Sequence, residues 1–201
     1  MKIGCECGEI VGHVANASPK TVNRAKCYCR DCQAAAFLGD ANKVLDEHGG
    51  TQVCQTIPAL VSFEQGVEKL QCIRLSKNGL MRWRSSCCNT PIANTLRDQK
   101  FAFVGLIHTG ITYPTMGEER DKLLGPCVFN VNTQTAINGP IKQVGVKRTI
   151  FKVLSGVVKA KLTGSYKQNP FFDSSTGDPI VEPRILSKEE RAALYEQLDS
   201  I

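Results

Sequence analysis

Three cysteines lie within six residues of the chain and could hold one soft metal ion together. They are Cys27, Cys29 and Cys32, in the segment CYCRDC. Thiolate sulfur suits zinc, which also needs no redox machinery. Three protein ligands with a fourth position left open form the pattern of a catalytic zinc. The spacing therefore predicts a reactive zinc centre with these three cysteines as the candidate catalytic residues.

A second set of four cysteines predicts a closed, structural zinc site. Cys5 and Cys7 lie in the segment GCECG, and Cys87 and Cys88 precede Pro91. Sulfurs on one tetrahedral zinc lie about 3.8 Å apart, so the backbone must curl between the first two, which the flanking glycines allow. Neighbouring residues usually point apart, so Cys88 can join Cys87 only if the peptide bends there. With the central three cysteines, this set predicts two zinc ions per chain.

Other interpretations of the cysteines follow from the same residues. The central trio would instead be structural if a fourth ligand closed it, and the candidates for that ligand are Cys54, Cys72, Cys127 or a histidine. Otherwise these three extra cysteines, which lie among apolar residues in strand-like runs, are expected to be buried packing residues. An iron–sulfur cluster on the trio would also need a fourth ligand.

The start of the chain bears on the disulfide alternative that ten cysteines raise. The segment MKIGCECGEI has no apolar leader, and no run approaches eighteen apolar residues. These features predict no membrane span and favour the reducing cytoplasm. In that compartment, clustered cysteines bind metals more often than they form disulfides.

The elements that must position these residues are mainly β. Residues 1–138 contain short runs rich in Val, Ile, Phe, Leu and Thr, bounded by Gly, Asn, Asp and Pro. The runs are Thr51–Ile57, Leu70–Leu75, Leu80–Arg84 and Phe101–Ile107. Lys77-Asn78-Gly79 predicts a hairpin turn, because Asn and Gly tolerate positive φ. Short helical turns are expected over Cys32–Leu38 and Gly117–Leu124.

Residues 139–201 are predicted to form a basic, helical C-terminal extension that packs on or next to the β domain. Apolar residues at helical spacing from Val146 to Val158 indicate a helix ending near Gly164, and a capping box at Ser187 starts a last helix over 188–199. The formal net charge is +6, and residues 141–167 carry seven Lys or Arg and no Asp or Glu. The basicity therefore belongs to this one segment.

The cysteine motifs resemble those of the glutathione-dependent formaldehyde-activating enzyme family, which includes centromere protein V. That family shows GxCxCG, then CHCxxCq, then FCxxCG with a nearby proline. This chain has GCECG over residues 4–8, CYCRDCQ over 27–33 and WRSSCCNTP over 83–91. The likeness covers about residues 1–110. The first two motifs match in order and spacing, and the third is degraded.

The resemblance implies the β-tent fold, in which several small coiled antiparallel sheets are pinned by zinc. It also implies a structural zinc on the outer cysteines, a reactive zinc on the central three, and carbon–sulfur lyase chemistry. The substrate would be a thiol adduct of a small aldehyde, such as S-hydroxymethyl-glutathione.

This chain departs from the family at two positions. Arg84 stands where the family has the first cysteine of FCxxCG, and Cys88 replaces its glycine. The outer site therefore needs Cys88 as the substitute ligand or must be rebuilt. Tyr28 replaces a histidine that is not expected to be a ligand.

Two functional hypotheses arise from these patterns. In the first, the chain is a zinc-dependent lyase, and Arg30 beside the metal loop holds a carboxylate of a glutathione-like substrate. In the second, it is a zinc-stabilised binding module without turnover, whose basic helix over 141–162 engages an acidic partner. Aromatic residues are sparse in that helix, which does not favour nucleic acid as the partner.

Overall fold

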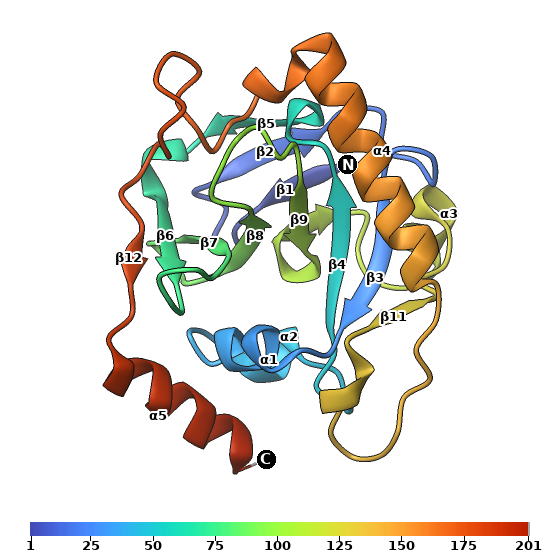
Figure 1. The fold of residues 1–201 in the computed structure, drawn as a ribbon, viewed down its shortest axis with the longest axis vertical. Helices are drawn as coiled ribbons and strands as arrows, with labels where there is room; N and C mark the ends of the chain where they lie inside the picture. The colour runs from blue at the N-terminus through green and yellow to red at the C-terminus, as the bar shows by residue number, and fades with distance from the viewer. Residues whose placement is uncertain (201) are drawn as a thin grey trace.

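Two β-sheets dominate the structure, as the mainly-β prediction requires. The computed structural model describes residues 1–200. A four-stranded sheet has the order β10-β1-β2-β5, and an eight-stranded sheet has the order β11-β3-β4-β9-β8-β7-β6-β12 (Figure 1). The strands are β1 (Lys2–Gly4), β2 (Val11–Val14), β3 (Asn23–Cys27), β4 (Thr51–Thr56), β5 (Val61–Gln65), β6 (Leu70–Arg74), β7 (Met81–Ser85), β8 (Pro91–Thr95), β9 (Val104–Ile107), β10 (Ile111–Tyr113), β11 (Phe129–Val131) and β12 (Arg184–Ile185).

Most strand pairs are antiparallel, but both edges of the large sheet are parallel. Strand β11 pairs with β3, and β12 pairs with β6, each in parallel. Several small, purely antiparallel sheets were expected, whereas the structure has one large sheet and one small one. The reason is that β3, β4, β9, β8, β7 and β6 pair in one unbroken antiparallel series.

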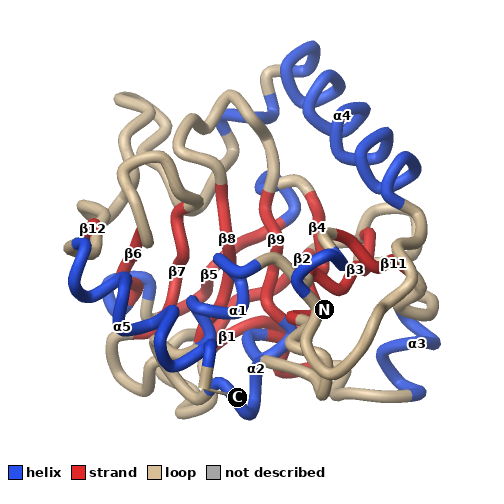
Figure 2. The backbone as a smooth tube through the Cα atoms, turned by 60° about the horizontal axis from the view of Figure 1, so that its bottom comes forward, coloured by secondary structure: helices blue, strands red, loops and turns tan. Residues whose placement is uncertain are grey.

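The helices lie outside the two sheets. They are α1 (Arg30–Ala36), α2 (Ala41–Val44), α3 (Glu118–Leu124), α4 (Val146–Thr163) and α5 (Lys188–Asp199), with short 3-10 turns η1 (Pro58–Leu60), η2 (Val67–Lys69), η3 (His108–Gly110), η4 (Thr133–Thr135) and η5 (Ser165–Lys167). Figure 2 shows α1 and α5 in front of the large sheet. None of the helices within residues 1–200 is both long enough and apolar enough to span a membrane.

The main core fills the space between the two sheets. Trp83 of β7 is buried there with Ile3 of the small sheet and with Phe171. Side chains alternate along a strand, so the neighbours of Trp83 in the sequence MRWRS point to the other face of the large sheet. That other face is covered by α1 and α2, which pack through Ala36 and Val44 against β4 and β9.

The segment after residue 139 joins the core of the preceding residues. Phe171 and Phe172 are buried, and both rings contact Trp83. The capping box predicted at Ser187 is present, and α5 then packs on the outer face of the sheet through Leu194 and Leu198.

Several predicted elements match the structure and others differ in detail. The helix after Gly117 is confirmed, and Gly164 ends α4 in a left-handed conformation. A turn at residues 76–79 joins β6 to β7, but neither Asn78 nor Gly79 has the positive φ that the prediction invoked. The run from Phe101 forms a strand only from Val104.

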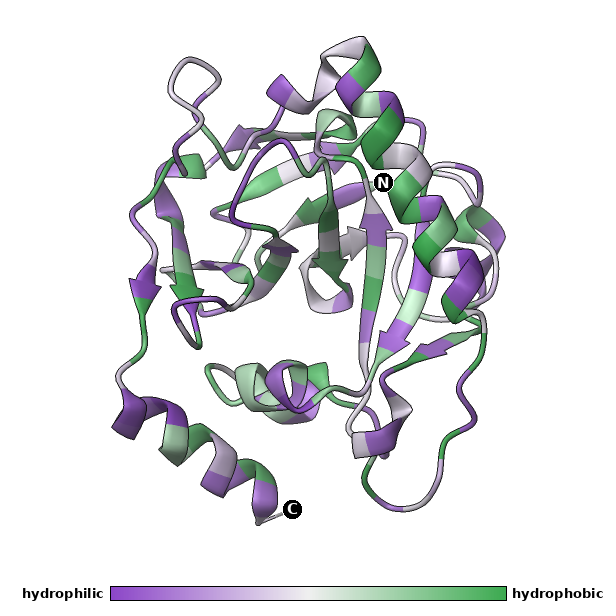
Figure 3. Ribbon diagram, viewed as in Figure 1, coloured by the Kyte–Doolittle hydropathy of each residue, from purple (hydrophilic) through white to green (hydrophobic). Residues whose placement is uncertain are grey.

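Helix α4 keeps less of its apolar surface buried than its sequence predicts. Val157 is buried against the rest of the chain, whereas Ile150, Leu154 and Val158 are exposed. Figure 3 shows hydrophobic and hydrophilic residues alternating around this helix. The apolar residues occupy a wider arc than one contact surface can cover, so part of that arc faces outward.

Candidate metal centres

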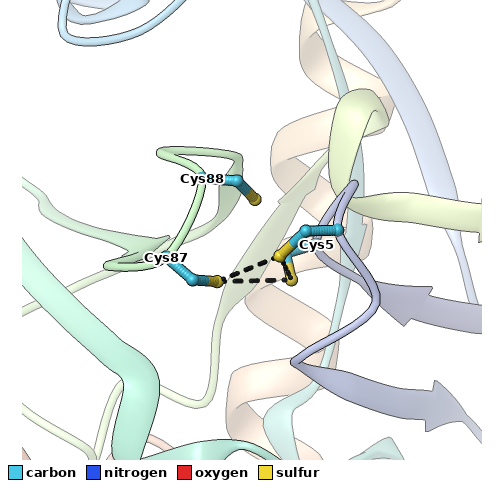
Figure 4. A group of neighbouring side chains, drawn as sticks. Cys5, Cys87 and Cys88 are labelled. Atoms are coloured by element: carbon cyan, nitrogen blue, oxygen red, sulfur yellow. Dashed lines mark hydrogen bonds between the residues drawn. The ribbon is translucent and has the colours of Figure 1, made fainter.

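The four outer cysteines converge at the junction of the two sheets. The sulfur–sulfur distances are 3.4 Å for Cys5–Cys7, 3.7 Å for Cys5–Cys87 and 3.2 Å for Cys7–Cys87. The sulfur of Cys88 completes a group whose ligand atoms all lie within 4.8 Å of one another (Figure 4). These distances approach the separation of about 3.8 Å that tetrahedral zinc requires. The four sulfurs could therefore bind one metal ion.

The loop after β1 curls as the first cysteine pair requires. Gly8 adopts a left-handed φ of 80°, and its N–H donates to the carbonyl of Cys5. The N–H of Ile10 donates to the Cys5 sulfur at 3.2 Å, which holds that side chain against the curled loop. Gly4 has a different role from the one predicted: a Cβ there would lie 2.1 Å from the Ile10 carbonyl oxygen. The absence of a side chain at Gly4 thus lets the backbone of Ile10 approach closely, and the curl itself depends on Gly8.

A tight turn between β7 and β8 brings both adjacent cysteines to the outer site. Asn89 in this turn adopts a left-handed φ of 58°. The Cys88 sulfur lies 3.3 Å from the hydroxyl of Ser85 and 3.1 Å from that of Thr90. The peptide bend thus lets Cys88 join Cys87, and Arg84 lies outside the cluster.

The three central cysteines also converge. Cys27 ends β3, Cys29 precedes α1, and Cys32 lies within α1, with all three sulfurs within 4.8 Å of one another. The Cys27–Cys29 sulfur distance is 3.5 Å, and the amide of Asn132 donates to the Cys27 sulfur at 3.3 Å. Hydrogen bonds from Cys29 and then Cys32 lower the pKa of Cys27 to about 2. The same contacts with Cys27 raise the pKa values of Cys29 and Cys32.

No fourth metal-binding side chain joins the central trio within residues 1–200. Cys54 and Cys72 are buried in the main core, as packing cysteines were predicted to be. Cys127 is half-buried, but it lies in a loop before β11 rather than in the strand-like run predicted for it.

The histidines contact other groups instead of the clusters. His13 pairs with the carboxylate of Glu64. His48 lies 3.2 Å from the carbonyl of Ile137. His108 contacts two backbone carbonyls, and burial lowers its pKa.

Arg30 lies beside the trio but has a partner already. Its guanidinium donates to Asp199 of α5 at 2.7 Å and stacks near the ring of Tyr195. Asp31 lies in the first turn of α1 and accepts a hydrogen bond from the Tyr195 hydroxyl. Both residues therefore tie α1 to α5.

One cavity lies away from both clusters. It measures about 320 Å³ and separates α4 from residues of β3 and β4. Its lining includes Lys20, Lys152 and Lys159 but no cysteine, histidine or carboxylate. A chemical site is therefore better supported at the cysteine clusters than in this cavity.

Comparison with known proteins places the chain in a family. Residues 1–183 match the "Family of unknown function (DUF6151)". The chain belongs to the DUF6151 family. Among solved structures, this DUF6151 member is similar to a crystal structure of a Rhodobacter sphaeroides protein. The likeness has a TM-score of 0.43 and 16% identity, and covers 63% of this chain and 97% of the other. No curated protein matches.

Proposed function

We propose that the protein is a zinc-dependent carbon–sulfur lyase acting on the thiol adduct of a small aldehyde, with a glutathione-type thiol. One observation carries this proposal: three cysteine sulfurs converge with no fourth protein ligand in residues 1–200. The order of the first two cysteine motifs, which resembles the formaldehyde-activating enzymes, supports the same chemistry. We further propose the β-tent class for the fold, with a structural zinc on the outer cysteines and a reactive zinc on the central trio.

The ligand set determines which chemistry a bound zinc would supply. A zinc ion and its three thiolates would together carry a formal charge of −1. Such a site would be better suited to binding a substrate thiolate than to making hydroxide. In the lyase direction, the hydroxyl of the hemithioacetal gives its proton to solvent water and its C–O bond becomes C=O. The C–S bond breaks, and its electron pair stays on sulfur as the thiolate. No oxidant or reductant is needed.

Arg30 is our candidate for holding a carboxylate of the thiol. It is half-exposed, and so is its present partner Asp199. Exposed ion pairs contribute only about 0–1 kcal/mol, so a substrate carboxylate can replace Asp199 at small cost.

Binding of a thiol to the cobalt-substituted protein tests the proposal directly. Adding glutathione should change the visible absorption of the cobalt protein, because a fourth sulfur enters the coordination shell. The matched control is the same tripeptide with serine in place of cysteine, which should leave the spectrum unchanged. If glutathione has no effect, or if both peptides act equally, the proposed sulfur chemistry is wrong.

A second candidate function rests on the exposed surface of α4. Phe151 is 72% exposed and Leu162 is 84% exposed, on the same side as Ile150, Leu154 and Val158. The lysines and arginine of the helix surround this stripe, and no acidic residue lies within it. Charge complementarity selects an acidic, amphipathic helix of another protein as the occupant.

A synthetic helical peptide with a leucine stripe flanked by glutamates probes this surface. Changing Leu154 and Val158 together to serine should weaken binding by roughly tenfold or more, since buried apolar contacts dominate such interfaces. Val128→Ser and Met116→Ser, at exposed apolar residues elsewhere, serve as controls. Fluorescence anisotropy measures the affinities. Equal binding by all variants, self-association through α4, or binding only to anionic vesicles would overturn this candidate.

A further inference from the structure

A small cavity lies between α1 and the large sheet, next to the central cysteines. Its volume is about 30 Å³, and Cys32 forms part of its wall. One water occupies about 10–15 Å³ on this scale, so the cavity has room for two waters or for an ion of three heavy atoms. The rest of the wall combines apolar residues, among them Trp83 of β7 and Pro91 of β8, with polar residues of β4, β7 and β8.

The alternation of β7 places two arginines at this cavity. Because Trp83 points into the main core, Arg82 and Arg84 point to the opposite face, under α1. Arg82 is 8% exposed and Arg84 is 4% exposed. Asn94, which pairs with Arg82 across the β7–β8 ladder, also lines the cavity.

The polar groups around the cavity lack partners of opposite charge. No salt bridge in residues 1–200 involves Arg82 or Arg84, although four other arginines have acidic partners. The Nε atoms of both arginines and the hydroxyl of Thr51 are buried without a hydrogen-bond partner. One guanidinium nitrogen of Arg84 does donate to the carbonyl of Asn89 at 2.7 Å.

Burying such groups unpaired is costly. Loss of hydration around a buried charge costs several kcal/mol unless a partner compensates it. Burial lowers the pKa of Arg84 to about 10, because loss of hydration disfavours its charged form. The unpartnered atoms are the Nε–H groups of two arginines and a hydroxyl, all of which can donate hydrogen bonds that an anion would accept.

We propose that this cavity is a binding site for a small oxyanion of the size of formate, held by Arg82, Arg84 and Thr51. The contact with Cys32 places such an anion beside the central cysteine trio. If the proposed lyase function holds, the same donors would face the oxygen that bears the negative charge when the C–S bond of the hemithioacetal forms or breaks. That use of the site rests on the proposed function, whereas binding of formate does not.

The alternative is that Arg82 only balances the charge of the cysteine thiolates. Arg82 acts electrostatically on Cys32, so the trio could be its counter-charge. In that case the cavity would bind no anion. Direct measurement of formate binding distinguishes the two roles.

Formate is the probe, and saturation-transfer NMR of its single proton on the metal-loaded full chain is the measurement. We expect specific binding that benzoate does not compete, since its ring exceeds the cavity. Arg82→Gln should weaken formate binding by roughly tenfold or more, the usual cost of a charge-assisted hydrogen bond. Arg74→Gln is the matched control, because Arg74 also has buried, unpartnered guanidinium nitrogens but does not line the cavity.

A second pair of variants, which removes a hydroxyl and no charge, tests the site if Arg82→Gln does not fold. Thr51→Val removes the unpaired hydroxyl at the cavity, and Thr149→Val removes a buried, unpaired hydroxyl in α4. Only the first should weaken formate binding. Absent binding, or equal loss in a variant and its control, overturns the site. Formate binding without turnover of a thiol adduct would instead count against the lyase function alone.

Discussion

Replacing Cys29 with serine is expected to abolish turnover of a hemithioacetal and to leave the chain folded. The change removes one of only three protein ligands at the central trio. The loss should exceed the roughly 10–100-fold cost of removing a residue that merely supports a metal ligand. The fold should tolerate serine, because Cys29 is the N-cap of α1 and makes no side-chain capping bond there, while serine is among the favoured N-cap residues. Release of free thiol from S-hydroxymethyl-glutathione measures turnover.

Cys127→Ser provides the control for this experiment. Cys127 is a half-buried cysteine outside both clusters, so its loss should leave turnover unchanged. Thermal unfolding of each variant separates chemistry from stability. Should Cys29→Ser unfold the chain or release both metals, the central zinc would be structural and the lyase hypothesis would fail.

Replacing Cys87 with serine is expected to lower stability strongly, although the residue is exposed. Exposed side chains outside special sites contribute about 0.5 kcal/mol or less. Loss of a metal present at 1,000 times its Kd costs about 4 kcal/mol. For a chain of this length that corresponds to a fall in Tm of roughly 8–16 °C. The outer sulfurs join the loop after β1 to the β7–β8 turn, so their ion would connect the two sheets.

Metal analysis provides the second measurement for Cys87→Ser. The unmodified chain should hold two zinc ions, and the variant one. Treating the unmodified protein with a chelator should reproduce the fall in Tm, after which Cys87→Ser should add little. A single zinc in the unmodified protein, or a variant as stable as the parent, would contradict a structural outer site.

Local sequence determined most elements of this protein and placed its cysteines in a near pair, a trio and a second pair along the chain. These sequence signals act over only a few residues. They are the CxC and CxxC spacings, the capping box at Ser187 and the glycine at the end of a helix. The structure accordingly has α5 over the predicted residues and ends α4 at Gly164. It also brings together all seven predicted metal ligands in the two predicted groups.

Tertiary structure alone decided which distant groups surround those cysteines. Asn132 reaches Cys27 because β11 pairs in parallel with β3. Arg82 and Arg84 flank Trp83 in the sequence, but only the packing of α1 on their side of β7 buries them beside Cys32. Likewise, the apolar spacing of α4 could not show that one side of the helix stays exposed. Burial is a property of what packs against a residue, and those partners come from segments far away in the chain.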